Sequence, residues 1–141
     1  MGPRWIALVA AILGLIAVGI GAMGSHSLPD RLKKSGLDEV QIAKKLEQCE
    51  IGVKYQMYHA LAMLAVGISV LPKNSALARA ACGMFLAGTL FFCGGLYSLS
   101  LFNTLGHWSI VPLGGVMFMI GWILLGLAVS FRAKSVDLNP N

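Results

Sequence analysis

Three histidines are the side chains of this sequence best suited to acid–base or metal chemistry. His26, His59 and His107 each stand alone, because the chain has no His-x-x-x-His pair and no Cys-x-x-Cys motif. Neutral imidazoles can bind zinc or copper, and two of them on different helices can ligate a haem. Isolated histidines are a weak metal pattern, however, so we predict neither a metal nor another cofactor. In the alternative interpretation, these rings hydrogen-bond to their neighbours and anchor helix ends near water.

Tyrosine and glutamine side chains accompany the histidines. Tyr55 and His59 are four residues apart and Gln56 and His59 are three apart, so in a helix both pairs share a face. A polar, ring-rich face of this kind could bind a lipid headgroup, a quinone, a metal or a protein partner. The candidate ligand or partner face comprises His26, Tyr55, Gln56, His59, Tyr97 and His107.

Carboxylates are missing where chemistry inside a membrane would need them. No aspartate or glutamate occurs from Ile51 to Val136, whereas proton and cation relays in membranes usually depend on buried carboxylates. A Ser–His–Asp arrangement also lacks its acid, since the nearest carboxylates, Asp30 and Glu50, lie in a polar segment. We therefore predict no catalytic residue and a protein that is not an enzyme.

The composition indicates a chain that is largely surrounded by lipid. Hydrophobic residues make up 57% of the 141 residues and charged residues only 12%, whereas globular proteins carry about 25% charged residues. The mean hydropathy is +0.75. The net charge of +5 comes from basic residues beside apolar segments, where such residues anchor helix ends and set topology. We therefore expect a lipid bilayer, and no nucleic acid, as a partner.

Four apolar segments approach the roughly 20 residues that a membrane-spanning helix needs. They cover residues 5–23, 55–71, 77–101 and 110–131. This pattern predicts an all-α membrane protein, a compact bundle of four transmembrane helices in a single domain over residues 1–141, with both termini on the same side. The first segment also resembles a signal peptide, but its apolar run is longer than the 7–15 or so residues of a signal core. We expect it to remain as an anchor.

One sizeable polar segment covers residues 25–54. Asp38 and Gln41 have the spacing of a capping box at a helix start, and Glu50 and Lys54 form a favourable i,i+4 pair. An amphipathic helix is predicted over about residues 38–54. Either it continues as one helix to residue 71, or it lies along the headgroups and bends near Gly52.

Small residues recur on one face of the predicted spans. In the first span, Ala10, Gly14, Ala17, Gly21 and Gly24 follow a four-three-four-three spacing, and a similar stripe runs through the third span. Small residues let helices approach closely in lipid, so we predict tight helix packing; room for a pigment or a lipid tail is the alternative. The glycines expected at helix contacts are Gly14, Gly21, Gly24, Gly83, Gly94, Gly114 and Gly121.

The basic residues also bear on orientation. We call the side that carries both termini side A and the opposite side B. Each exposed segment of side A contains lysine or arginine, whereas the last loop on side B, residues 102–109, contains neither. The total counts on the two sides are nearly equal, but this distribution favours side A in the cytoplasm. All three histidines are then expected near side B.

Several stretches resemble motifs of a known family. Residues 21–28, Gly-Ala-Met-Gly-Ser-His-Ser-Leu, resemble its Gly-Ala-Phe-Gly-Ala-His-Gly-Leu motif, with Ser25 and Ser27 in place of Ala and Gly. Residues 55–61, Tyr-Gln-Met-Tyr-His-Ala-Leu, are similar to its second motif almost residue for residue. Residues 92–97 resemble its third-span motif, and residues 112–115 with Gly121-Trp122 resemble its last-span motif. The family is the YgdD-like group of bacterial inner-membrane proteins, which has eukaryotic transmembrane relatives.

The resemblance implies a four-span protein of the bacterial inner membrane, and it implies no reaction. We therefore expect a non-enzymatic accessory or assembly subunit of a larger membrane complex, which packs against a membrane-protein partner or against copies of itself. The alternative is a small binder or carrier of a lipid, a quinone or a metal. Convergence of His26, Tyr55 and His59 around a cavity would favour the alternative, whereas hydrogen bonding within the chain would favour the accessory subunit.

Overall fold

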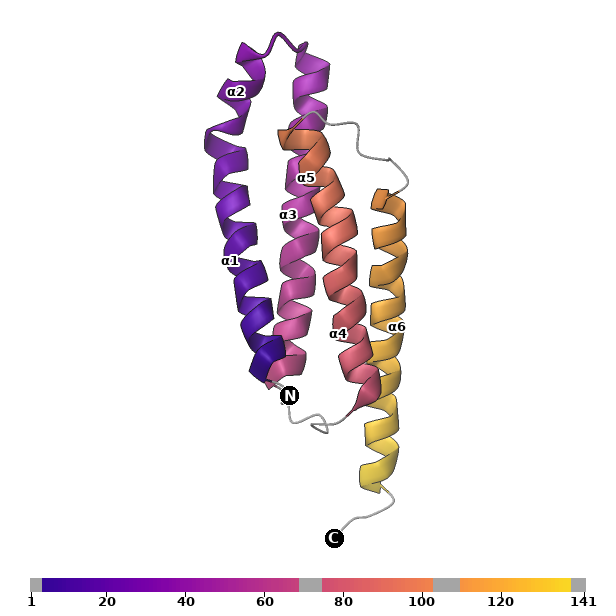
Figure 1. Ribbon diagram of the computed structural model, residues 1–141. Coiled ribbons are helices and arrows are strands. Elements are labelled where there is room, and N and C mark those ends of the chain that lie inside the picture. Colours follow the sequence, from indigo (N-terminus) through magenta and orange to yellow (C-terminus); the bar gives the residue numbers. More distant parts are fainter. Residues whose placement is uncertain (1–3, 69–74, 103–109, 138–141) are drawn as a thin grey trace.

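The computed structural model describes residues 4–68, 75–102 and 110–137 (Figure 1). Within these ranges the regular elements are all helical, which confirms the all-α prediction. The elements are α1 (Arg4–His26), α2 (Leu28–Lys34), α3 (Glu39–Ile68), α4 (Ala76–Gly88), the π-helical turn η1 (Thr89–Cys93), α5 (Gly94–Leu101) and α6 (Ile110–Asp137).

Three of these helices are long and apolar enough to cross a membrane. They are α1, the continuous helix from Ala76 to Leu101, and α6 over Ile110–Phe131, and they correspond to the first, third and fourth predicted spans. The second predicted span falls within α3, where Gln56 and His59 lower the hydropathy, and its last three residues, 69–71, lie outside the described residues.

α3 is one continuous helix, so the alternative of a bend near Gly52 is wrong. At its start, Gln41 donates its backbone N–H to Asp38 Oδ1 at 2.7 Å, and Asp38 donates to Gln41 Oε1 at 3.3 Å, which confirms the capping box. The i,i+4 pair is also present: Lys54 Nζ lies 2.6 Å from Glu50 Oε1.

Gly52 of α3 has a packing role. A Cβ placed at Gly52 would lie 2.7 Å from Cε1 of Tyr97, closer than carbon atoms can approach. The missing side chain thus lets the Tyr97 ring of α5 lie against the backbone of α3. Close approach, and not a change of direction, explains a glycine at this point of the helix.

The helices follow one another in a row, and the compact bundle that we expected is not confirmed. α1 packs along α3, α3 packs against α4, η1 and α5, and α6 packs against α4 and η1, so that α1 and α6 form the two edges (Figure 1).

Each edge helix buries one stripe of residues. In α1, the buried residues Ile6, Ala10, Leu13 and Ala17 are three or four apart, while the outward-facing Leu15 is 73% exposed. In lipid such outward apolar surface carries no hydrophobic penalty.

Four of the seven glycines expected at helix contacts do lie against a neighbouring helix. A Cβ at Gly114 would clash with the backbone of Phe92, and a Cβ at Gly121 would lie 2.6 Å from Cε1 of Phe85. On the other side of the molecule, Gly21 faces Val53 and Gly24 faces Cys49.

The other three, Gly14, Gly83 and Gly94, have no heavy atom within 4 Å of the position of a Cβ. Gly83 and Gly94 lie on the outward surface, so within this chain they are not helix contacts. The glycines of the Ala76–Leu101 helix that do contact α6 are Gly88, which lies against Phe118, and Gly95, which lies against Val111. Gly83 and Gly88 both lie in α4, before the π-helical turn η1, so the face that α4 turns toward α6 decides which of them is a contact.

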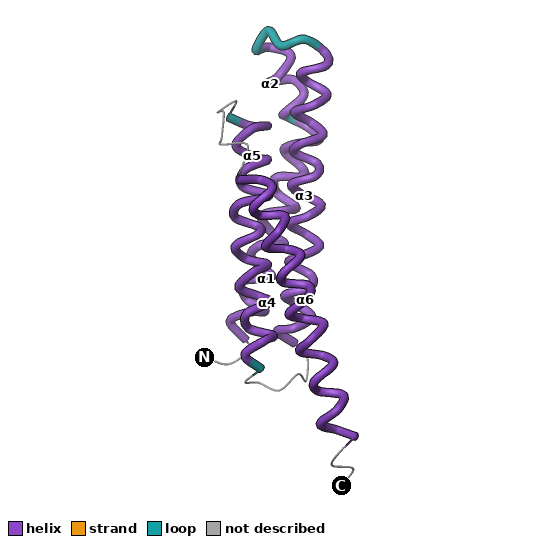
Figure 2. The backbone as a smooth tube through the Cα atoms, turned by 90° about the vertical axis from the view of Figure 1, so that its right-hand side faces the viewer, coloured by secondary structure: helices purple, strands orange, loops and turns teal. Residues whose placement is uncertain are grey.

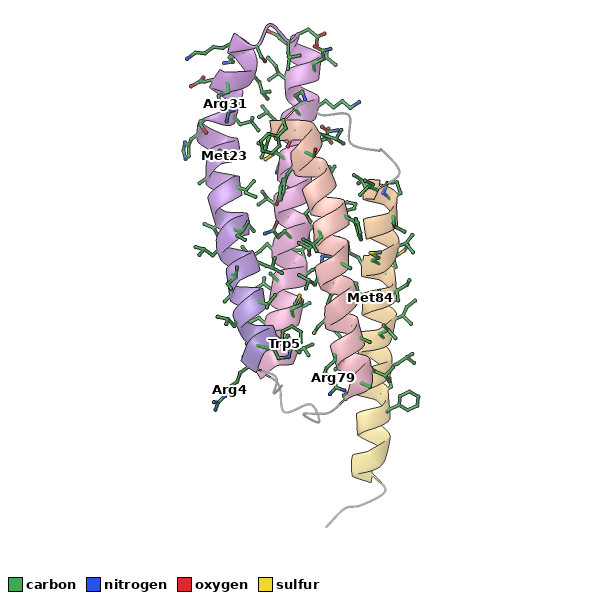
Figure 3. All side chains as sticks on the ribbon, in the orientation of Figure 1. Arg4, Trp5, Met23, Arg31, Arg79 and Met84 are labelled. Atoms are coloured by element: carbon green, nitrogen blue, oxygen red, sulfur yellow. The ribbon has the colours of Figure 1, made fainter. Side chains whose placement is uncertain are left out.

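The two ends of the molecule differ. α1 and α4 start at the end where α3 and α6 finish, and the turn between α2 and α3 lies at the opposite end (Figure 2). Figure 3 shows Arg4 and Arg79 at the first of these ends, which corresponds to side A, and Arg31 toward the other, side B.

Candidate functional site

His59 lies in a cluster of rings between α3, α4 and α6. Its side chain is buried, with 4% of the residue exposed. The imidazole stacks on Phe118 with ring centroids 3.5 Å apart and planes 7° apart, and its centroid lies 5.2 Å from that of Phe85. Trp122 Nε1 donates a hydrogen bond to His59 Nε2 at 3.2 Å. Three helices thus position this one ring.

These contacts determine the tautomer of His59. An indole N–H can only donate, so Nε2 of His59 accepts and carries no proton. In the neutral ring the proton is then on Nδ1, which lies 2.7 Å from the carbonyl oxygen of Tyr55 and donates to it. Because the Nε2 lone pair is occupied by Trp122 and Nδ1 holds the proton, the imidazole as placed offers no free lone pair to a metal.

Gln56 is a second buried polar side chain, one turn from His59, with 3% exposed. Its Nε2 donates to the carbonyl of Leu13 in α1 at 2.8 Å, and its Oε1 accepts from Tyr97 Oη in α5 at 3.0 Å. A single amide therefore connects three helices. In an apolar environment these bonds also satisfy polar atoms that would otherwise lack partners.

The depth of these residues differs from our expectation. We predicted His59 near side B, but Gln56 reaches Leu13, which is close to the midpoint of α1. The reason is the register of α1 against α3. Gly24, near the side B end of α1, lies beside Cys49, and His59 is ten residues further along α3, or about 15 Å at 1.5 Å per residue.

His26 does not join this cluster. It is the last residue of α1 and is exposed. It lies two residues beyond Gly24, which faces Cys49, and so about 18 Å from His59 along the direction of α3. The expected face is therefore divided: Tyr55, Gln56, His59 and Tyr97 come together, and His26 lies apart. His107 lies outside the described residues.

A groove of about 610 Å³ opens beside the ring cluster, between α3 and α6. Tyr55 and Tyr58 of α3 line one side and are 42% and 56% exposed. The Tyr55 ring lies 4.8 Å from the ring of Phe92. The remaining lining residues are His59, Pro112, Gly115, Val116, Phe118, Met119 and Trp122.

The sequence did not point to Phe85 or Phe118 as part of the site, and Phe92 was singled out only as the first residue of the third-span motif. Phenylalanines in apolar spans are common core residues, so nothing in their type distinguishes them. A partial signal existed, because Pro112 and Trp122 belong to the last-span motif. The contact between Trp122 and His59 depends on the packing of α6 against α4.

Among the described residues, no group of three histidine, cysteine, aspartate or glutamate side chains could hold a metal. Cys49, Cys82 and Cys93 are all free and buried. The arrangement at His59 and Gln56 is therefore one of hydrogen-bonded, ring-packed polar side chains beside an apolar groove.

The sequence relationships of the chain agree with this membrane-embedded arrangement. Residues 20–115 match the family described as "Protein of unknown function (DUF423)". The chain belongs to this family. The matched range includes His26, Gln56, His59 and Tyr97, whereas Phe118 and Trp122 follow it.

Relatives of this DUF423 protein span nearly its whole length. It is 37% identical to a UPF0382 membrane protein of Haemophilus influenzae, over 96% of this chain and 100% of the relative. It is 33% identical to the UPF0382 inner membrane protein YgdD of Escherichia coli, over 97% and 98% of the two chains. The UPF0382 membrane protein YwdK of Bacillus subtilis is 36% identical, over 86% and 92%. The resemblance to YgdD-like proteins is thus confirmed, and this DUF423 chain is a membrane protein. No solved structure matches it.

Proposed function

We propose that this protein is a four-span inner-membrane protein, with both termini in the cytoplasm, that acts without catalysis as an accessory or assembly subunit of a larger membrane complex. The observation that carries this proposal is the use of Gln56 and His59. Both side chains are buried and bonded to groups of the same chain. They hold helices together, and their donors and acceptors are not directed at a substrate.

The fourth span in this proposal is α3. It runs beside α1 from the contact of Cys49 with Gly24 to that of Gly67 with Ala7, which supports a crossing by α3 of the membrane that α1 crosses. Its buried polar atoms have partners, which removes the main cost of placing Gln56 and His59 in hydrocarbon.

The row of helices supports a role in packing against a partner. Edge helix α6 leaves Met119, Trp122 and Ile123 at least half exposed, and two of these residues line the aromatic groove. Tyrosine and tryptophan are enriched in protein interfaces because their rings contribute large contact areas. A helix of a partner protein, or of a second copy of this chain, would fill the groove between α3 and α6.

The native mass of the protein, extracted from its own membranes in mild detergent, tests the proposal. We expect migration in a defined larger complex, and cross-linking to a partner from a photoreactive residue at position 119. The matched control is position 15, which is also well exposed (73%, against 60% at position 119) but lies on α1, away from the groove. Migration as a monomer, with cross-links that do not differ between the two positions, would contradict a partner in the groove.

The groove favours a second candidate function, the binding of a lipid or a quinone. Its volume of about 610 Å³ is within the range of small-molecule sites, about 300–1,000 Å³, and rings form much of its lining. Extraction of the purified protein with organic solvent would yield a stoichiometric quinone or lipid in this case. Gly115→Leu, which fills the groove, would then abolish that yield, whereas Gly83→Leu on the outward face of α4 would not.

A further inference from the structure

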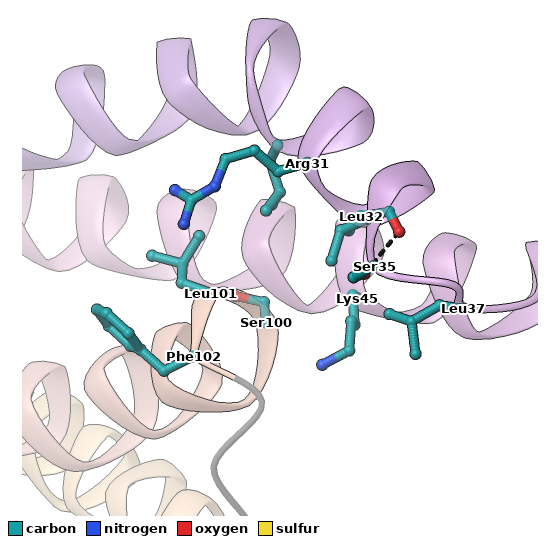
Figure 4. A pocket seen from close by; sticks show the side chains of 9 residues that line it. Arg31, Leu32, Ser35, Leu37, Lys45, Ser100, Leu101 and Phe102 are labelled. Atoms are coloured by element: carbon teal, nitrogen blue, oxygen red, sulfur yellow. Dashed lines mark hydrogen bonds between the residues drawn. The ribbon is translucent and has the colours of Figure 1, made fainter.

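A second cavity, of about 190 Å³, lies at the side B end between α2, the start of α3 and the end of α5 (Figure 4). Two basic side chains from different helices, Arg31 of α2 and Lys45 of α3, extend toward the end of α5 (Figure 4). The other lining residues are Leu28, Leu32, Ser35, Leu37, Ser100, Leu101 and Phe102. None of the nine is acidic, so the pocket is positively charged.

Lys45 has one hydrogen-bond acceptor for its ammonium group. Its Nζ donates to the carbonyl of Leu99 at 2.7 Å, in the last turn of α5, where the helix dipole favours a cation. An ammonium has three N–H donors, so two remain. The Arg31 guanidinium brings five more donors and forms neither a salt bridge nor a hydrogen bond among the residues that the structure describes.

The serines of the pocket do not supply donors. Ser35 Oγ donates to the carbonyl of Leu32 at 2.7 Å, and Ser100 Oγ donates to the carbonyl of Tyr97 at 3.3 Å. Each hydroxyl has a single proton, and each donates it to a backbone carbonyl. An anion in this pocket would therefore be held by Arg31 and Lys45, and its affinity would follow their charge.

The pocket lies at the boundary of the apolar layer. α1 and the Ala76–Leu101 helix, both long and apolar enough to cross a membrane, end at His26 and Leu101 beside it. Phe102, which is 73% exposed, together with Leu28 and Leu101, gives the pocket apolar walls next to the two cations. A ligand that combines a phosphate with hydrocarbon chains matches both parts.

We propose that this pocket binds the phosphate of an anionic phospholipid, with Arg31 as its main charged contact and Lys45 as the second. Basic pockets at membrane boundaries attract anionic headgroups, and a guanidinium can bind two phosphate oxygens at once. The site is separate from the groove between α3 and α6, and it does not depend on the protein's having a protein partner.

Native mass spectrometry of the full chain in mild detergent, with phosphatidylglycerol and phosphatidylcholine as probes, tests this site. We expect the protein to bind phosphatidylglycerol in preference to phosphatidylcholine. The Arg31→Gln variant should bind phosphatidylglycerol about fivefold more weakly, because one cation near a membrane surface contributes about 1 kcal/mol. The matched control is Lys33→Gln, which removes the same charge from α2 but does not line the pocket. Equal losses in the two variants, or equal binding of the two lipids, would overturn the proposal.

Inorganic phosphate is the third probe, because it shares the anionic group but lacks the chains. We expect an excess of it to leave phosphatidylglycerol bound, since Leu28, Leu101 and Phe102 contact only a lipid. Complete displacement of the lipid by phosphate would show a site for free phosphate and would overturn the assignment to a lipid. Unfolding midpoints of both variants equal to that of the unchanged protein would exclude misfolding as the cause of lost binding.

Discussion

Gln56 and His59 place polar atoms deep among apolar helices, where an unpaired donor or acceptor costs several kcal/mol. The structure pairs them with three different kinds of group: backbone carbonyls (Leu13 and Tyr55), a phenol (Tyr97) and an indole (Trp122). The same bonds join α1, α3, α5 and α6. At the scale of the residue, polarity inside this membrane protein serves to specify which helices meet.

Replacing Gln56 with leucine should lower the free energy of unfolding by about 1–2 kcal/mol, because it removes two interhelical hydrogen bonds and leaves Tyr97 Oη without its acceptor. Tyr97→Phe should cost about 0.6 kcal/mol, the average for such a bond in a membrane protein. The measurement is unfolding by sodium dodecyl sulfate in mixed micelles, followed by circular dichroism.

Tyr58→Phe is the control for this pair, since Tyr58 is 56% exposed and its hydroxyl forms no hydrogen bond among the described residues. We expect no measurable change from it. Losses in the Gln56→Leu, Tyr97→Phe double variant should be smaller than the sum of the single losses, because the two side chains share one bond. Strict additivity would argue against the Gln56–Tyr97 contact.

At the scale of the element, the helix from Ala76 to Leu101 carries its contacts on a face that the sequence pattern did not predict. Gly83 and Gly94 lie on the outward surface, while Gly88 and Gly95 lie against α6 on either side of the π-helical turn η1. Thr89 Oγ1 donates to the carbonyl of Phe85 at 2.9 Å at the start of this turn. Glycine spacing alone does not reveal which face of a helix meets its neighbour.

Gly114→Ala and Gly94→Ala make a matched test of these faces. A methyl group at Gly114 would clash with the backbone of Phe92, so we expect a loss of about 1–3 kcal/mol from overpacking. At Gly94 nothing lies within 4 Å of a Cβ, so alanine should stabilise the helix by up to about 1 kcal/mol. The same detergent unfolding measures both. A larger loss at Gly94 than at Gly114 would show that the outward face packs against another chain.

At the scale of the whole molecule, the row of helices leaves two edges and two broad faces to lipid or to partners. α1 and α6 each have one main neighbour in the row. This arrangement explains why exposed apolar residues are found along α1 and α6, for example Leu15 and Ile123, with exposures of 73% and 63%. The aromatic groove and the basic pocket both border α3 but lie at different heights, beside α6 and beside α2 and α5 respectively.

The four-span topology predicts which cysteines a charged maleimide can reach. Val40→Cys, at the side B end and 79% exposed, should react only from the side opposite to tags placed on the two termini. Leu15→Cys is exposed to a similar degree but should not react, because its exposed surface faces lipid. The three native cysteines are buried and should give little background. Labelling of Val40→Cys from the side of the N-terminus would mean that α1 does not cross the membrane, and tags on the two termini that lie on opposite sides would mean that α3 does not cross it.

The sequence by itself determined the solvent, the helical class and much of the local structure. An acid-free stretch from Ile51 to Val136 requires lipid around it whatever the packing. The capping box at Asp38 and the ion pair of Glu50 with Lys54 involve residues three and four apart, which a helix brings together without tertiary contacts. These features were predictable because they depend on composition or on the geometry of one helix.

Only the tertiary structure decided which polar residues form the site. His26 and His59 were expected together, but the register of α1 against α3 places His26 at one end and His59 near the middle. Phe118 and Trp122 meet His59 because α6 packs against α4 at Gly114 and Gly121. In lipid the hydrophobic effect does not select which helix faces meet. Shape complementarity and a few hydrogen bonds between residues far apart in the sequence select them instead.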